Sequence, residues 1–202
     1  MGKVTASLAI SLDGVMAGPN QSQDAPMGEG PGERLVEYMH KWMFGEPEKH
    51  EAALAALQAP SAMILGRNMF SPGRGEWDPE WRGWWGENPP YHAPVFVLTH
   101  YPRKPLVMEG GTTFTFLTDG PESALAQARE AAGEGIVGIG GGLRTVRQYL
   151  SAGSIDELYL HIAPVILGSG ERLLDGVTGI SLEPFGVSGN SNVTHISYRV
   201  LH

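Results

Sequence analysis

Hydrophobic positions along the chain fall into short runs separated by polar and glycine-rich segments. Apolar runs of four to eight residues are typical of buried strands, whereas alternation of apolar and polar residues is typical of a half-exposed strand. The alternation predicts a half-exposed strand at 113–118. The apolar runs predict buried strands at 4–10, 62–65, 94–99, 136–139 and, as the longest and central one, 155–167.

Between these runs, apolar residues recur at helical spacing. Residues 35, 36, 39 and 43 predict one helix, and an alanine-rich helix is expected at about 48–58. The residues from Gly66 to Phe70 should open a further helix. The remaining predicted helices cover 121–132, with Pro121 near its start, and 143–150, with an apolar face of Leu143, Val146, Tyr149 and Leu150.

The end of the chain has a different pattern. Two apolar stretches, 180–187 and 193–201, flank the turn residues 188–191 and predict an antiparallel hairpin. Strand–helix units closed by a hairpin indicate an α/β fold with a mostly parallel sheet and an antiparallel edge. The glycine- and proline-rich residues 18–32 should form a loop, and no repeat or domain boundary is visible in the 202 residues.

Composition narrows the function classes. A net charge of −8, with only 14 scattered basic residues, argues against a nucleic-acid surface. The absence of cysteine excludes disulfides, thiol nucleophiles and cysteine-ligated zinc, and the histidines lack metal-ligand spacing, so no metal is expected. No apolar run reaches the ~18 residues of a membrane helix, and the N-terminus lacks a signal-peptide pattern. A cytoplasmic protein without a membrane partner is expected.

Known catalytic motifs are also missing. The chain has no G-x-S-x-G elbow and no G-x-x-x-x-G-K-[ST] loop. A G-x-G-x-x-G match at 133–138 precedes a predicted strand instead of following one, so it is not a Rossmann fingerprint.

The strongest local signal is a glycine turn. The predicted strand 136–139 is followed by Gly140, Gly141 and Gly142 and then by an amphipathic helix. Glycines let the backbone approach a phosphate, and the free N–H groups of a helix N-terminus carry about half a positive charge. Three glycines could simply make a tight connection, but in this position they favour a ligand site over that alternative.

Four stretches resemble the dihydrofolate-reductase superfamily, most closely the branch related to the C-terminal reductase domain of riboflavin biosynthesis. They are Ser11-Leu-Asp-Gly14, Ile64-Leu-Gly-Arg-Asn-Met69, the Gly140–Gly142 turn, and Ile155-Asp-Glu-Leu158 leading to Ala163-Pro-Val-Ile-Leu-Gly168. The resemblance implies a three-layer α/β/α fold formed by a single domain, 1–202, with a tryptophan-rich insertion at about 71–93. It also implies an NADPH-dependent reductase of a planar heterocycle, similar to 5-amino-6-(5-phosphoribosylamino)uracil reductase, and a homodimer.

The resemblance assigns cofactor contacts along the chain. Arg67 would hold the adenosine 2′-phosphate through charge-assisted bonds, although its spacing alone favours an ordinary surface arginine. The glycine-turn amides would take the pyrophosphate, and Met16 would lie over the nicotinamide or belong to the core. The full set of expected cofactor residues is Met16, Ala17, Gly18, Gly66, Arg67, Asn68, Leu98, Thr99, His100, Ile139, Gly140, Gly141, Gly142, Leu143, Arg144 and Thr145.

The proton donor is the least defined part of the expected site. Asp13 and Glu37 are the catalytic candidates, but Asp13 could cap its own turn, and Glu37, like Glu33, could belong to a solvated helix face. The related reductases usually carry a lysine where this chain has Ser7 and a glutamate where it has Gly140. A true dihydrofolate reductase and a non-catalytic NADPH-binding sensor therefore stay as alternatives.

Two aromatic features have more than one interpretation. Residues 76–85 hold four of the five tryptophans and could form a lid over a planar substrate. They could also anchor a loop into the body or into a second subunit. We favour anchoring, because so many indole rings require burial. His161, inside a long apolar run, is expected to be a hydrogen-bonded core histidine.

Overall fold

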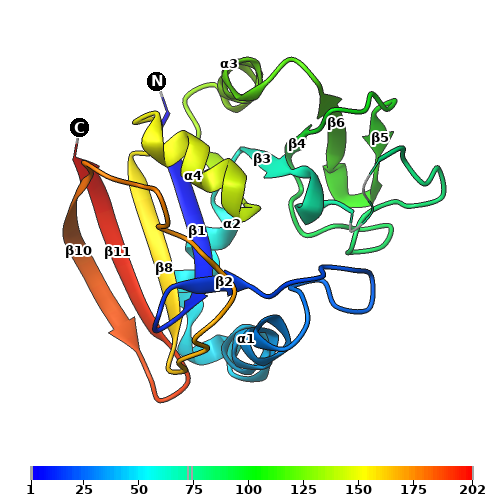
Figure 1. Cartoon of the computed structure of the whole chain (residues 1–202). Helices are drawn as coiled ribbons and strands as arrows, with labels where there is room; N and C mark the ends of the chain where they lie inside the picture. Colours follow the sequence, from blue (N-terminus) through cyan, green and yellow to red (C-terminus); the bar gives the residue numbers. More distant parts are fainter. Residues whose placement is uncertain (1, 72, 74, 202) are drawn as a thin grey trace.

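A nine-stranded sheet runs through the middle of the molecule in the computed structural model, which describes residues 2–71, 73 and 75–201 (Figure 1). The strand order is β10-β11-β8-β1-β7-β3-β4-β6-β5, and all neighbours from β8 to β6 are parallel. The parallel strands are β1 (Val4–Ser11), β3 (Ala62–Gly66), β4 (Pro94–Leu98), β6 (Thr113–Leu117), β7 (Val137–Ile139) and β8 (Glu157–Ala163).

Antiparallel strands complete both edges. At one edge, β10 (Ser181–Gly189) and β11 (Thr194–Leu201) form a hairpin, and β11 pairs with β8. At the other edge, the short β5 (Leu106–Val107) pairs with β6. This arrangement confirms the predicted mostly parallel sheet with a C-terminal antiparallel hairpin.

Helices cover the two faces of the sheet. On one face lie α3 (Pro121–Ala132) and α4 (Leu143–Ser151), whose buried residues share a core cluster with Val4, Ala6 and Leu8 of β1. On the other face lies α1 (Pro31–His40), where Leu35 packs against Ala163. A π-helical turn at Lys41–Gly45 and a 3₁₀ turn at Pro47–Lys49 connect α1 to α2 (Glu51–Gln58).

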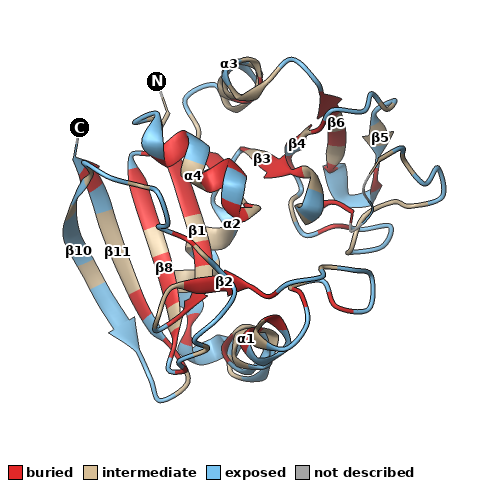
Figure 2. Ribbon diagram, in the orientation of Figure 1, coloured by how far each residue is buried: buried red, intermediate tan, exposed pale blue. Residues whose placement is uncertain are grey.

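The alternation of side chains along the central strands explains these layers. Leu158 and Leu160 of β8 point into the cluster beneath α3 and α4, whereas His161 contacts Trp42 on the other face. Buried residues concentrate on β1, β8 and α4, and β10 is exposed along most of its length (Figure 2). The apolar face predicted for 143–150 is confirmed, because Leu143, Val146, Tyr149 and Leu150 are all buried.

Two predicted elements are shorter in the structure. The helix expected to open at 66–70 is only a 3₁₀ turn, Arg67–Met69. The sequence has a proline and a glycine shortly afterwards, and both residue types disfavour a longer helix. The strand expected at 155–167 ends at Ala163, because Pro164 has no N–H to donate to a sheet.

A second, two-stranded sheet was not predicted from the sequence. It pairs β2 (Val15–Ala17) with β9 (Glu171–Arg172) in antiparallel fashion. Both strands are too short to show a periodicity, so only the fold brings them together. This small sheet holds Met16 and Ala17 beside the carboxyl ends of the central strands.

Candidate cofactor-binding cleft

A cleft of about 560 Å³ lies where β3, β4 and β6 end and where α3 and α4 begin. The N-cap residues of the two helices, Gly120 and Gly142, line the cleft. Because glycine has no side chain, neither residue can form a side-chain capping hydrogen bond. The first-turn N–H groups of both helices therefore make the cleft suited to an anion. The lining residues are Met16, Ala17, Gln21, Met27, Gly66, Arg67, Asn68, Met69, Gly73, Gly75, Leu98, Thr99, His100, Tyr101, Thr118, Gly120, Pro121, Gly142, Leu143, Arg144, Thr145, Gln148 and Glu171.

The glycine turn is held against the end of β3. Gly140 N donates to Ile64 O at 2.9 Å, and Gly66 N donates to Gly141 O at 2.5 Å. A Cβ atom on Gly66 would lie 2.5 Å from Thr145 Oγ1, closer than real Cβ contacts allow, and 3.0 Å from the backbone Gly142 N, which is also tight. Gly66 is therefore required where β3 meets the turn. Gly141 has φ of 109°, which also favours glycine, and the Gly141–Gly142 peptide is cis.

Most of the expected cofactor residues line this single cleft. They are Met16, Ala17, Gly66, Arg67, Asn68, Leu98, Thr99, His100, Gly142, Leu143, Arg144 and Thr145. The others lie behind it. Ile139 is buried in the main core, Gly140 and Gly141 support the turn, and Gly18 N donates to Met27 O within the loop.

Arg67 is held in place by the tryptophan-rich segment. Its guanidinium lies 3.9 Å from the centre of the Trp77 ring and 5.1 Å from that of Tyr101. Arg67 also donates to Gly73 O at 3.1 Å and to Glu76 O at 3.3 Å. No carboxylate pairs with Arg67 among the described residues, and burial lowers its pKa from the ordinary value. A cation held by stacking and by backbone carbonyls leaves donors free for a ligand phosphate.

The charges around the cleft are mostly positive. Arg144, in the first turn of α4, is exposed and forms no ion pair with any described residue. Glu171 of β9 is the single carboxylate among the described lining residues. Two arginines and two helix N-termini thus favour an anionic ligand despite the chain's net charge of −8.

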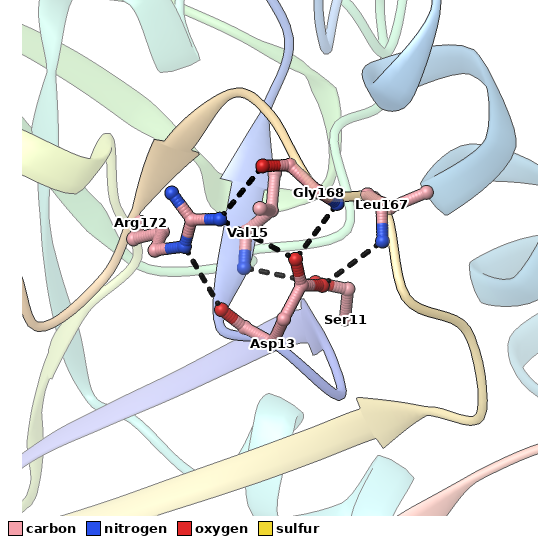
Figure 3. A network of polar contacts seen from close by, with 6 residues as sticks. All are labelled: Ser11, Asp13, Val15, Leu167, Gly168 and Arg172. Carbon is pink, nitrogen blue, oxygen red and sulfur yellow. Dashed lines mark hydrogen bonds and ion pairs between the residues drawn. The ribbon is translucent and has the colours of Figure 1, made fainter.

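Asp13 does not line the cleft; it organises a turn (Figure 3). Its carboxylate accepts hydrogen bonds from Leu167 N at 3.0 Å, Gly168 N at 2.8 Å and Ser11 Oγ at 2.7 Å. Arg172 lies 3.5 Å from the same carboxylate. These bonds, that of Leu167 first, hold the pKa of Asp13 well below its usual range. The structure therefore gives Asp13 a turn role, and its role as a proton donor stays a prediction.

Glu37 also lies away from the cleft. It is exposed on α1 and forms an ion pair with Lys41 at 2.8 Å, which lowers the pKa of its carboxyl group. Glu33 is likewise exposed. Both positions fit the alternative of a solvated helix face, and the catalytic role of Glu37 stays a prediction.

The tryptophan-rich segment is anchored into the body. Trp77 packs against Phe116 with ring centres 5.0 Å apart and donates from Nε1 to Tyr101 O at 2.8 Å. Trp81 donates to Phe70 O at 2.6 Å. Both rings pack on a second core cluster beneath β4 and β6, and neither lines the cleft. For these two residues, anchoring was the correct interpretation.

A buried histidine cluster lies on the sheet face covered by α1. His161 is 3% exposed, and its Nε2 lies 2.8 Å from Ser7 Oγ, as expected of a hydrogen-bonded core histidine. His195 Nδ1 lies 2.7 Å from His161 Nδ1, and His50 Nδ1 lies 2.8 Å from His195 Nε2. Trp42 packs against all three rings. Sequence reasoning missed this cluster, because only the β8–β11 register places His195 opposite His161.

Neither a membrane span nor a metal site emerges from the described part of the chain. None of its helices is long and apolar enough to cross a bilayer. No group of three or more histidine, aspartate or glutamate side chains there has the arrangement of a metal site, the three clustered imidazoles included.

The mostly parallel sheet, the helices on both faces and the cleft at the strand ends define a dihydrofolate-reductase-like fold. Residues 2–190 match the model of the RibD C-terminal domain, and the chain belongs to that family. No curated protein matches the sequence.

Solved structures share this fold at low sequence identity. A putative riboflavin biosynthesis protein from Shewanella sp. PV-4 matches with a TM-score of 0.63 and 20% identity over 100% of both chains. Dihydrofolate reductase from Enterococcus faecalis, complexed with NADP(H), matches with a TM-score of 0.54 and 18% identity over 98% of this chain and 96% of that one. A deaminase/5-amino-6-(5-phosphoribosylamino)uracil reductase from Thermotoga maritima matches with a TM-score of 0.57 and 14% identity over 98% of this chain and 56% of that one.

Proposed function

We propose that this protein is an NADPH-dependent reductase of a planar nitrogen heterocycle. The observation that carries the proposal is the convergence of the α3 and α4 N-termini, the glycine turn, Arg67 and Arg144 on one cleft. A dinucleotide with a pyrophosphate and a 2′-phosphate has charges that suit these groups. Family membership and the NADP(H) complex of the enterococcal dihydrofolate reductase support the choice of cofactor.

The residues present can be assigned to parts of such a cofactor. Arg67, beside Thr99 and His100, would bind the 2′-phosphate, and the Gly142–Thr145 backbone with Arg144 would bind the pyrophosphate. Met16 and Ala17 of β2 would lie at the nicotinamide end. The bound cofactor supplies the hydride. The chain supplies orientation and exclusion of water, and Glu171 is the described carboxylate that remains on the cleft wall.

The related riboflavin-pathway reductase makes 5-amino-6-(5-phosphoribosylamino)uracil the first substrate to test. NADPH oxidation by the pure protein would be followed with this compound and, separately, with dihydrofolate. Turnover of dihydrofolate would favour the alternative of a dihydrofolate reductase. NADPH binding without oxidation by any heterocycle would favour a sensor, an alternative motivated by the turn role of Asp13 and the outward position of Glu37.

The cofactor assignment has its own test. A binding titration should show tighter binding of NADPH than of NADH. Equal affinity for the two cofactors would contradict the assignment. The single-domain organisation of residues 1–202, the homodimer and the cytoplasmic location stay predictions beside this proposal.

A further inference from the structure

A continuous chain of hydrogen bonds crosses the sheet face beneath α1 and leads to Ser7. His161 lies 2.8 Å from Ser7 Oγ through Nε2 and 2.7 Å from His195 Nδ1 through its own Nδ1. His195 Nε2 lies 2.8 Å from His50 Nδ1, and His50 Nε2 lies 3.2 Å from Asn190 Nδ2. The three imidazole rings belong to β8, β11 and the residue preceding α2.

The far end of this chain fixes the direction of its hydrogen bonds. Asn190 Oδ1 accepts from Asn192 N at 2.8 Å, so the side-chain amide has a defined orientation. Asn190 Nδ2 donates to Glu46 Oε2 at 3.0 Å. Glu46 Oε2 also accepts from Asn192 Nδ2 at 3.2 Å, and Lys49 pairs with the other carboxylate oxygen at 2.6 Å. Because an amide nitrogen only donates, His50 Nε2 must be the acceptor in its contact with Asn190.

This orientation determines the tautomer of each histidine in turn. A neutral imidazole has one N–H and one acceptor nitrogen. His50 therefore donates from Nδ1 to His195 Nε2, and His195 donates from Nδ1 to His161 Nδ1. His161 must then donate from Nε2 to Ser7 Oγ. Each neutral ring thus donates its single N–H group: His50 to His195, His195 to His161, and His161 to Ser7.

Burial supports the neutral state on which this argument depends. His50, His161 and His195 are 4%, 3% and 7% exposed. Burial, together with the neighbouring histidines, lowers the pKa of His161 and His195 below the ordinary histidine value. A charged ring would also need a further acceptor, and Trp42, packed against all three rings, offers none.

The consequence for Ser7 is a hydroxyl group that accepts from His161 and keeps its own hydrogen to donate. No other described residue forms a hydrogen bond with Ser7 Oγ. The opposite direction would have let His161 take the serine proton, as in a nucleophile–base pair. The direction set by Asn190 excludes that role and makes Ser7 a hydrogen-bond donor.

Ser7 is half-buried on β1, close to the start of the glycine turn. The β1–β7 register pairs Ala6 with Ile139, so Ser7 is level with Gly140, the first residue of the glycine turn. Level residues of parallel strands share a face, and Gly140 presents no side chain there. Ala9, two positions along the same face of β1, is small, and both Ser7 and Ala9 are half-buried.

We propose that Ser7 donates a hydrogen bond to a carbonyl oxygen or unprotonated ring nitrogen of the heterocyclic substrate. His161, His195 and His50 are positioning residues that fix the direction of this bond. The inference rests on the proposed function and adds a specificity rule to it. A heterocycle with an acceptor atom at this position receives the hydrogen of the Ser7 hydroxyl group, and one without such an acceptor loses this bond.

The direction of the chain can be tested without any substrate. Nitrogen-15 NMR of the intact protein should show N–H at Nε2 of His161 and at Nδ1 of His195 and His50. The double variant Glu46→Gln with Asn190→Asp exchanges carboxylate and amide at the end of the chain while keeping the net charge. It presents an acceptor to His50 Nε2, so the proton of His161 should move from Nε2 to Nδ1.

The single variant Glu46→Gln is the matched control, because Asn190 keeps its donor and the tautomers should not change. A proton at Nδ1 of His161 in the unchanged protein would overturn the inference. So would a double variant that folds normally and leaves the His161 tautomer where it was.

The contact with substrate is tested by kinetics with 5-amino-6-(5-phosphoribosylamino)uracil as the probe. Ser7→Ala should raise KM or lower kcat/KM by about ten- to hundredfold, as expected for loss of one buried donor, whereas Ser7→Thr keeps the hydroxyl and should lose less. The Glu46→Gln, Asn190→Asp variant should lose activity comparably without altering Ser7 itself. NADPH affinity should be the same in all of these variants.

The outcomes separate the two proposals. If the unchanged protein fails to bind NADPH or to oxidise it with any heterocycle, the proposed function is contradicted, while the NMR result still decides the direction of the chain. If the unchanged protein turns over the substrate and Ser7→Ala has the same kcat/KM, only the proposed contact between Ser7 and the substrate is overturned.

Discussion

The guanidinium of Arg67 lies 3.9 Å from the centre of the Trp77 ring, so the tryptophan-rich segment positions the main cation of the cleft. Trp77 is itself fixed by its bond to Tyr101 O at 2.8 Å and by packing on Phe116. The tryptophan-rich segment therefore helps to fix one wall of the cleft. A segment that the sequence marks as unusual serves here to hold an arginine.

Arg67→Ala should abolish the preference for NADPH over NADH. Loss of charge-assisted bonds of about 1.5–3 kcal/mol predicts a roughly ten- to hundredfold weaker binding of NADPH, with little change for NADH. Fluorescence titration of both cofactors measures this. Arg199→Ala, which removes an exposed arginine paired with Glu183 on the distant hairpin, is the control and should bind both cofactors normally.

Trp77→Leu should weaken NADPH binding indirectly. Cation–π contacts at such sites contribute about 0.5–1 kcal/mol, so a two- to fivefold loss is expected from a less ordered Arg67. Trp85→Leu changes a ring that is 48% exposed and should leave the titration unaltered. If Trp77→Leu and Trp85→Leu behave alike, the stacking does not position the arginine.

The sequence predicted the parts of this site that depend on local pattern. Apolar runs identified the central strands, and the glycine turn before an amphipathic helix identified the start of α4 in the cleft. The strand pair β2–β9 and the histidine cluster depend on contacts between distant segments. His161 meets His195 only through strand register, and His50 reaches both only through the turns after α1, so neither spacing nor composition could reveal them.

Asp13 shows a different limit of sequence reasoning. Its proximity to the expected nicotinamide made it a catalytic candidate, whereas its carboxylate is occupied by two backbone N–H groups and Ser11. Asp13→Asn should therefore lower the free energy of unfolding by about 1–3 kcal/mol, because an amide replaces acceptors that face donors. Urea denaturation measures the loss. Any reductase activity of the folded variant should persist, and selective loss of activity with unchanged stability would support Asp13 as a catalyst.

Gly66→Ala should destabilise the protein and disturb the cleft. The new methyl group would lie 2.5 Å from Thr145 Oγ1 and 3.0 Å from Gly142 N, and the backbone atom cannot give way freely. Overpacking of this kind costs about 1–3 kcal/mol, measurable by urea denaturation, and should also weaken cofactor binding. Gly45→Ala is the control, since its Cβ would lie 3.7 Å from the nearest atom, in ordinary contact.

The histidine cluster should lower the free energy of unfolding as the pH falls from 7 to 5, a range in which most carboxylates are still ionised. Burial and the neighbouring histidines lower the pKa of His161 from 6.5 to about 3, and burial with His50 lowers that of His195 to about 4. Below pH 6.5 the unfolded chain takes up protons that the folded chain does not. The stability present above this pH is therefore lost progressively as the pH falls towards the folded-state values.

Urea denaturation at pH 7, 6 and 5 tests this dependence. His161 and His195 each contribute a slope of at most about 1.4 kcal/mol per pH unit once these histidines are protonated in the unfolded chain. His161→Gln removes one titrating group while keeping a polar side chain, so its slope between pH 6 and 5 should be shallower than that of the unchanged protein. His100→Gln, at an exposed position, should keep the full slope. A free energy of unfolding that stays constant from pH 7 to 5 would show that the three rings are not buried as a neutral chain.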